Sequence, residues 1–293
     1  MQPSEKAIGQ SKIQSIQILR GLAAMVVAIY HLKEFTVPEE PFKGILDFFF
    51  MNGAAGVNLF FIISGFIMVH ITQRRTYNAS GIGSFLFKRF IRIWPTYAVI
   101  TIIYAFLTFK FRIHWEIKNI IYSLLFIPLN AEPPPHFGYS TLPVGWSLNY
   151  EIYFYFIVGI CLLFTTYRWI VFSVIMLVTL VFVPSLSGHF TLDPDQSNNF
   201  VNPYLNMITN PIVWNFVYGI IIGLLFSNHK SNDFLSKLFS NKLLTASVII
   251  LACWQYLSGF FGGLGANEWG IGMFFLLLAF IFYTNYHQSV FPN

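Results

Sequence analysis

Charged residues are scarce in this 293-residue chain: they make up 10% of it, whereas 56% of the residues are hydrophobic and 19% are aromatic. A soluble domain carries about 25% charged residues. So little polar surface cannot cover a water-soluble globule, which excludes that class. The composition therefore predicts an integral membrane protein.

Cysteines and recognisable cofactor motifs are also rare. Cys161 and Cys253 lie far apart in apolar runs, without metal-ligand spacing, so both are expected to be small buried hydrophobic residues. The chain has no P-loop, no dinucleotide fingerprint and no clustered metal-ligand pattern. We therefore expect no metal. The net charge of +5 does not indicate a nucleic-acid partner, because basic residues in membrane proteins first set orientation.

Eight apolar stretches approach the roughly 20 residues that a membrane-spanning helix needs. They are residues 16–37, 53–71, 90–109, 144–164, 169–187, 211–227, 242–262 and 269–287. Residues 119–130 are too short to span and precede a proline-rich segment, so a re-entrant or surface helix is expected there, with a true span as the alternative. The fold class predicted is an all-α polytopic bundle of about eight spans, in one transmembrane domain over residues 1–293.

Basic residues predict the orientation, because they concentrate on the cytoplasmic side of membrane proteins. Placing the N-terminus inside puts most of the 17 basic residues there. The polar residues 1–15 have no cleavage site after the first apolar run, so that run is expected to be a retained anchor. Both termini are then cytoplasmic, and residues 188–210 form the longest outer loop, with the bilayer as an obligatory partner.

The segment RGLAAMVVAIYH, residues 20–31, carries Arg20 and His31 on one helical face, about 16 Å apart along the axis. Charges inside a bilayer cost on the order of 3 kcal/mol each and indicate function by default. Arg20 is expected near the inner boundary, where the alternative is a simple anchor. His31 is expected toward the outer half, where the alternative is an interfacial histidine. Imidazole can take a proton from a hydroxyl at neutral pH.

The segment FLFKRFIRIWPTY, residues 85–97, carries Arg89 and Arg92 on the same side of a helix, flanked by Lys88. Two guanidinium groups on one face can bind phosphate oxygens, as a nucleotide-bearing substrate would require. The alternative is a basic cluster that only sets topology. Pro95 can kink or locally open this helix.

Glu151 lies within the aromatic segment VGWSLNYEIYFYF, residues 144–156. No basic residue is its sequence neighbour, so its partner is expected on another helix. A carboxylate that orients or charges His31 is the functional hypothesis, and a purely structural carboxylate is the alternative.

Small residues are concentrated in GAAGVNLFFIISGFIM, residues 53–68, at Gly53, Gly56, Ser64 and Gly65. They favour close helix packing over room for a ligand. The other histidines lie at expected boundaries or in loops. None has an aspartate five residues later (His31 is followed there by Thr36), which excludes the HxxxxD lipid acyltransferases.

The four segments SIQILRGLAAMVVAIYH, GAAGVNLFFIISGFIM, FLFKRFIRIWPTY and VGWSLNYEIYFYF, in this order, resemble the integral-membrane acyltransferase 3 family. SLLFIP followed by GWSLNYE is most similar to its exopolysaccharide O-acetyltransferase branch. The resemblance implies transfer of an acyl group, usually acetyl, from cytoplasmic coenzyme A to a sugar hydroxyl at the outer face. The family's Arg/Lys-x10-His motif falls on Arg20 and His31, its Arg-x-x-Arg motif on Arg89 and Arg92, and its glutamate on Glu151.

Three departures from that pattern stand out. Asn58 replaces a frequent aspartate, which removes a charge although hydrogen bonding could survive, and Asn215 replaces a frequent glutamate. Family members usually have two further spans after the position where this sequence stops. A shortened C-terminus is therefore expected, either from truncation or in a shorter subgroup.

The combined prediction is a bacterial inner-membrane O-acetyltransferase that uses acetyl-CoA as co-substrate and a polysaccharide or lipid-linked sugar as acceptor. The candidate catalytic residues are His31, Glu151 and Arg20, and the candidate donor-binding residues are Arg89, Arg92 and Lys88. His31 is the general base or a transient acyl carrier. The alternatives are a transporter or flippase for a lipid-linked saccharide, and an inactive truncated family member.

Overall fold

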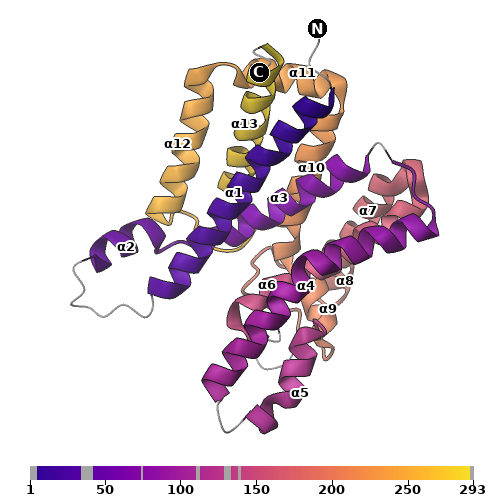
Figure 1. The fold of residues 1–293 in the computed structure, drawn as a ribbon, viewed down its shortest axis with the longest axis vertical. Coiled ribbons are helices and arrows are strands. Elements are labelled where there is room, and N and C mark those ends of the chain that lie inside the picture. The colour runs from indigo at the N-terminus through magenta and orange to yellow at the C-terminus, as the bar shows by residue number, and fades with distance from the viewer. Residues whose placement is uncertain are drawn as a thin grey trace. The chain divides into compact units, whose positions relative to one another are not determined.

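The computed structural model describes residues 5–33, 42–73, 75–109, 113–128, 133–137 and 140–290, without side chains at 5–15, 113–115 and 288–290. These residues form helices and loops, with no strand among them, as the all-α prediction requires. They fall into two compact units, which are described separately (Figure 1). Unit 1 comprises Met1–Gln73 and Trp214–Asn293, and unit 2 comprises Arg74–Val213.

Unit 1 is organised around one central helix, α3. Its helices are α1 (Glu5–Lys33), α2 (Lys43–Phe50), α3 (Ala55–Thr72), α10 (Trp214–Ser227), α11 (His229–Phe239), α12 (Lys242–Ser258) and α13 (Trp269–Val290). Helix α3 packs against α1, α10 and α13. Its apolar stretch is 72% buried and that of α1 only 17%, so α3 forms the core of the unit and α1 lies on its edge.

Glycines allow the helices of unit 1 to touch backbone to backbone. A Cβ on Gly65 would lie 2.2 Å from the Phe216 carbonyl oxygen, and one on Gly219 would lie 2.0 Å from that of Ile62. On the other side of α3, Gly53 and Gly56 lie against α1 in the same way. The packing role predicted for these glycines is therefore confirmed, because any side chain there would force the helices apart.

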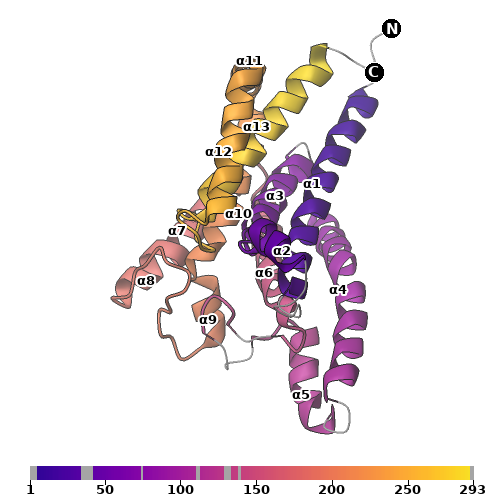
Figure 2. The same ribbon diagram turned by 90° about the vertical axis from the view of Figure 1, so that its left-hand side faces the viewer.

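The two ends of unit 1 have different partners. At one end the Asn52 amide donates to the Tyr256 carbonyl (2.6 Å) and the Tyr256 hydroxyl donates to the Phe49 carbonyl (2.7 Å), which joins α2 to α12. At the other end lie the first turns of α1, helix α11 and the last turns of α13 (Figures 1 and 2). Asn285 of α13 donates there to Asn232 and Ser236 of α11, at 2.9 and 2.8 Å.

Unit 2 is built on a long helix and a broken one. Its elements are α4 (Ala79–Phe109), α5 (Ile113–Leu124), η2 (Pro143–Gly145), α6 (Trp146–Cys161), η3 (Leu162–Tyr167), α7 (Arg168–Leu177), a π-turn η4 (Val178–Phe182), α8 (Val183–Leu186), α9 (Pro203–Ile208) and η5 (Pro211–Val213). Helix α4 continues through Pro95. Thr165, at φ 38°, separates α6 from α7, and Arg168 closes the break by donating to the Thr165 and Arg75 carbonyls.

The short helix expected at residues 119–130 is α5, but it begins and ends earlier, at Ile113 and Leu124. Phe126 ends it with a positive φ of 56°. Trp94 and Tyr97 of α4 donate to the carbonyls of Leu124 and Ser123, at 3.0 and 3.2 Å. These two bonds take up the carbonyls that a longer helix would have used. Residues 129–130 lie outside the described part of the chain.

The apolar helices are those of a multi-pass membrane protein. Five helical stretches in the described ranges are long and apolar enough to cross a membrane, or six if α10 and the sharply bent α11 count as one. The predicted spans 144–164 and 169–187 lie in one stretch, Pro143–Leu186, and α12 is shorter than the others. The count of eight, the single domain and the cytoplasmic termini stay predictions. Residues 1–4, 34–41 and 291–293 lie outside the described part.

One expectation about the cysteines is wrong. Cys161 is buried in α6, but Cys253 is exposed on α12. Helix α12 is apolar on its outer surface as well, where Leu251 and Trp254 are also exposed. A small, weakly polar thiol fits such a lipid-facing surface as well as it fits a core.

Candidate functional site

Arg20 lies on α1 with its guanidinium over the ring of Phe60 in α3, 4.7 Å from the ring centroid. Helix α3 continues from Phe60 to Thr72, which is about 18 Å of helix. Arg20 therefore lies about 18 Å of α3 away from Thr72 and about one helical turn inside the candidate span Ile16–Lys33, and both an anchor and a functional role stay predictions. A cation–π contact of this kind stabilises a guanidinium away from water.

His31 is half-buried in the last turn of α1. Its ring packs edge-on against Tyr30, with centroids 5.1 Å apart. Two residues later, the Lys33 ammonium donates to the Asp47 carboxylate of α2 at 3.2 Å and lies 5.6 Å from the Tyr30 ring. The candidate base therefore lies beside an ion pair that joins α1 to α2. Sequence reasoning missed Lys33, although its position one turn from Tyr30 was a signal.

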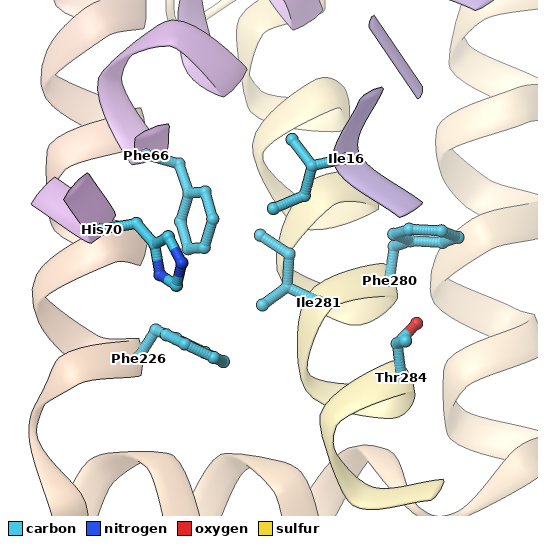
Figure 3. A pocket seen from close by; sticks show the side chains of 7 residues that line it. All are labelled: Ile16, Phe66, His70, Phe226, Phe280, Ile281 and Thr284. Carbon is cyan, nitrogen blue, oxygen red and sulfur yellow. The ribbon is translucent and has the colours of Figure 1, made fainter. Parts of the chain in front are cut away.

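A small pocket of about 20 Å³, room for a single water molecule, lies near the start of α1 in unit 1 (Figure 3). Its walls are Ile16, Phe66, His70, Phe226, Phe280, Ile281 and Thr284. The His70 ring stacks on Phe66, with centroids 5.9 Å apart, and brings an imidazole into an apolar cavity (Figure 3). Sequence reasoning placed His70 at a boundary and did not find this role.

The pocket, Arg20 and His31 follow one another along α1. Ile16, Arg20 and His31 fall within about 60° on the helical wheel, and the first and last are about 22 Å apart along the axis. Three features therefore follow one another along α1. They are the small apolar pocket that His70 of α3 also lines, the Arg20 guanidinium against Phe60, and the half-buried imidazole of His31.

The basic cluster of unit 2 lies on α4. Arg89 is half-buried, and its guanidinium lies 5.9 Å from the centroid of the Phe85 ring. The buried Nε of Arg89 has no hydrogen-bond acceptor in the described ranges. Lys88 and Arg92 are exposed beside it. A buried cationic donor without an acceptor is costly, and a bound anion would satisfy it.

Glu151 is 1% exposed in α6, and the hydroxyl of Tyr155 donates to its Oε1. One partner of Glu151 thus lies on its own helix, and a charged partner on another helix stays a prediction. Tyr155 is four residues later on the same helix, where side chains meet, so the EIYFY spacing already contained the signal.

The chain before α6 is fixed against the same helix. The Tyr150 hydroxyl donates to the Pro135 carbonyl at 2.7 Å, and the His136 ring packs edge-on on Trp146, 4.6 Å away. Asn149 is 3% exposed, and its Oδ1 has no hydrogen-bond donor in the described ranges. Polar groups therefore surround the part of α6 that carries Glu151.

The candidate residues are divided between the two units. Arg20 and His31 belong to unit 1, whereas Lys88, Arg89, Arg92 and Glu151 belong to unit 2. The structure brings Arg20 and His31 together on α1, and the basic residues together on α4. The expected pairing of Glu151 with His31 stays a prediction.

The two internal departures from the family pattern lie side by side. Asn58 and Asn215 are both fully buried, and the Asn58 amide donates to Asn215 Oδ1 at 3.3 Å. Both amides also donate to the Leu264 carbonyl, at 2.8 and 3.0 Å. The expectation that hydrogen bonding could survive the loss of charge is confirmed. Two neutral amides lie side by side here, where two ionised carboxylates would repel.

The segment 188–210, expected to be the longest outer loop, is held by its own asparagines. Asn206 donates to the Phe200 carbonyl (2.7 Å), and Asn210 to that of Pro194 (2.8 Å). Partial burial and then the neighbouring Asp193 raise the pKa of Asp195, while His136 lowers it. No group of three or more potential ligand side chains in the described ranges is arranged to hold a metal ion.

Comparison with known proteins gives one family and two curated relatives. The family described as "Acyltransferase domain" matches residues 13–289. "Exopolysaccharide production protein ExoZ" of Rhizobium meliloti (strain 1021) is 31% identical over 179 residues, 59% of this chain and 51% of that protein. "Nodulation protein 10" of Rhizobium leguminosarum bv. viciae is 26% identical over 266 residues, 84% of this chain and 67% of that protein.

The matched region thus covers about half of the first relative and two thirds of the second. No solved structure matches the chain. The family match extends across both units and includes every candidate residue.

Proposed function

The chain belongs to this acyltransferase family, and on that premise we propose that it transfers an acyl group, acetyl in the first instance, from acyl-CoA to a sugar hydroxyl of an exported polysaccharide or its lipid-linked precursor. The name of one relative, an exopolysaccharide production protein, supports a polysaccharide acceptor. The bacterial inner membrane is the location that fits a cytoplasmic donor and an exported acceptor.

The observation that carries this proposal is the series along α1. The small pocket at Ile16 lies near the predicted cytoplasmic end, Arg20 packs against α3 one turn further along, and His31 lies at the predicted outer end. A thioester donor and a sugar acceptor that approach from opposite sides need such a path. The buried, unsatisfied Nε of Arg89 supports a phosphate-binding role for Arg89, Arg92 and Lys88 toward coenzyme A.

The reaction needs one base. His31 accepts the proton of the sugar hydroxyl while the hydroxyl oxygen attacks the thioester carbonyl carbon. The C–S bond then breaks, and the coenzyme A thiolate takes the proton from the imidazolium, so that thioester and alcohol become ester and thiol. In the alternative, the imidazole carries the acyl group between two transfers. Arg20 supplies positive charge along the donor path, and Glu151 orients or charges the imidazole.

The decisive experiment expresses the chain in a host without the activity and measures O-acetyl esters on the exported polysaccharide by NMR. Wild type adds esters, and His31→Ala loses about 10²–10⁴-fold, the range typical of a general base. His189→Ala is the matched control, because His189 is an exposed loop histidine. Unchanged esterification by a membrane-inserted His31→Ala protein would overturn the mechanism. Altered export without altered acetylation would indicate a transporter.

Two further measurements test the other roles. If Glu151 acts through His31, the double variant Glu151→Gln/His31→Ala loses no more activity than His31→Ala alone, as residues of one catalytic unit behave. Additive losses would separate Glu151 from His31. In vesicles, Arg89→Gln is expected to raise KM for acyl-CoA about tenfold with little change in kcat. Arg75→Gln, at an exposed arginine of the same unit, is the control.

A further inference from the structure

Helix α11 has a position and an exposed surface that play no part in the acyl-transfer mechanism proposed above. It follows α10 after a bend of 98°, and it lies at the end of unit 1 where α1 begins (Figures 1 and 2). Pro211–Ser227 and α11 are long and apolar enough for a membrane-spanning stretch only when they are counted together, and the bend divides that stretch. If α10 runs along the membrane normal, α11 runs nearly parallel to the membrane surface, on the predicted cytoplasmic side.

One face of α11 is packed against the protein. Ser236 and Phe239 are 6% and 5% exposed, and both Asn232 and Ser236 accept from the Asn285 amide of α13. The side chain of Asn228 caps the first turn by accepting from the Ser231 amide at 3.2 Å. Helix α11 is therefore a fixed part of unit 1 and not a loose connection.

The remaining surface of α11 divides into two stripes. Phe234 and Leu238, four residues apart, are 67% and 42% exposed. Lys230, Asp233 and Lys237 follow a neighbouring stripe at helical spacing and are also exposed. Asp233 lies 2.7 Å from His229, and the stripe carries two lysines against one aspartate, so it is basic on balance. An apolar stripe beside a basic one is the pattern of a helix that lies in a membrane interface.

We propose that α11 binds the headgroup region of the cytoplasmic leaflet, with Phe234 and Leu238 inserted among the acyl chains and Lys230 and Lys237 bound to anionic phospholipid phosphates. Coenzyme A also carries phosphates, but binding those phosphates to the lysines would leave Phe234 and Leu238 exposed to water. The combination of both stripes therefore favours a lipid.

The insertion of the apolar stripe is tested by spin labels on the full-length protein in nanodiscs of phosphatidylglycerol and phosphatidylcholine. Cys161→Ala/Cys253→Ala removes both native thiols, and single cysteines are placed by Phe234→Cys, Leu238→Cys, Lys230→Cys and Asp233→Cys. Labels at 234 and 238 are expected to collide with oxygen more than with an aqueous nickel chelate, and labels at 230 and 233 the reverse. Equal nickel accessibility at all four positions would overturn the proposal.

The anionic preference is tested by retention of phosphatidylglycerol over phosphatidylcholine, measured by native mass spectrometry. Each interfacial lysine is expected to contribute about fivefold, so Lys230→Gln/Lys237→Gln should lower the preference about 30-fold. Lys118→Gln, at an exposed lysine of unit 2, should leave it unchanged. Wild-type preference in the double variant would contradict the proposal. A raised KM for acyl-CoA with unchanged lipid preference would assign the lysines to the donor instead.

Discussion

The two units keep polar side chains inside an apolar bundle in different ways. In unit 1 the fully buried Asn58 and Asn215 are neutral; the Asn58 amide donates to Asn215, and both amides donate to the Leu264 carbonyl. In unit 2 the buried residues include Glu151, whose carboxyl group accepts from the Tyr155 hydroxyl. Neutral pairs can be purely structural, whereas a buried carboxylate is costly to keep and points to chemistry.

The units differ in packing as well. The helix backbones of unit 1 meet at Gly65 and Gly219, and its central helix is largely buried. In unit 2 the apolar stretch of α4 is only 22% buried, and Thr165 breaks the helical path between α6 and α7. Tight backbone contact resists any added side chain, while an exposed helix tolerates it.

The largest effect is expected from breaking the tight contact of unit 1. Gly219→Ala places a methyl group 2.0 Å from the Ile62 carbonyl oxygen, so the helices must separate. We expect a loss of about 3 kcal/mol, at the upper end of ordinary overpacking, seen as a lower thermal midpoint in detergent.

Two glycine variants serve as controls for that prediction. Gly21→Ala on α1 and Gly83→Ala on α4 add a methyl group where no atom lies within 4 Å. Each should hold or slightly raise the midpoint, because alanine favours helix more than glycine does. Equal losses at all three positions would refute the packing argument.

The second-largest loss of stability is expected when the Asn58–Asn215 pair of unit 1 receives a carboxyl group like that of Glu151 in unit 2. Asn58→Asp replaces an amide donor with a carboxylate that faces the Asn215 Oδ1 and the Leu264 carbonyl, which are both acceptors. We expect a loss of about 2 kcal/mol at pH 7 and a smaller one in acid, where a protonated carboxyl can donate.

Asn228→Asp is the matched control, because aspartate caps a helix about as well as asparagine. Its free energy of unfolding should stay within a few tenths of a kcal/mol of the wild-type value. A stable Asn58→Asp protein at pH 7 would contradict this prediction and show that unit 1 tolerates a buried carboxylate.

The smallest effect concerns the loop of residues 188–210 in unit 2. The pKa of Asp195 is raised from 3.8 by partial burial and by Asp193, so the folded state prefers the protonated form. Stability from this preference is present below 3.8 and is lost as the pH rises through the raised value. Asp195→Asn should therefore raise the thermal midpoint slightly at pH 7 and leave it unchanged near pH 3.5. An equal shift at both pH values would rule out titration of Asp195 as its cause.

Some of the site was predictable because it depends on spacing along one helix. Arg20 and His31 share a face of α1, and Arg89 lies one turn from Arg92, as 3.6 residues per turn requires. The Tyr155 partner of Glu151 was predictable for the same reason but was missed. The short helix α5 was predicted as an element, although its ends were not, because Trp94 and Tyr97 fix them from a distant part of α4.

The sequence by itself determined that this chain is an all-helical membrane protein, which family it belongs to, and which ionisable residues lie in apolar helices. Those properties follow from composition, hydrophobic length and local spacing. Only the tertiary structure decided that Arg20 packs on Phe60, that His70 lines a pocket, and that Asn58 and Asn215 form one pair. Those contacts join residues up to 157 positions apart, and no local pattern specifies which distant helix faces which.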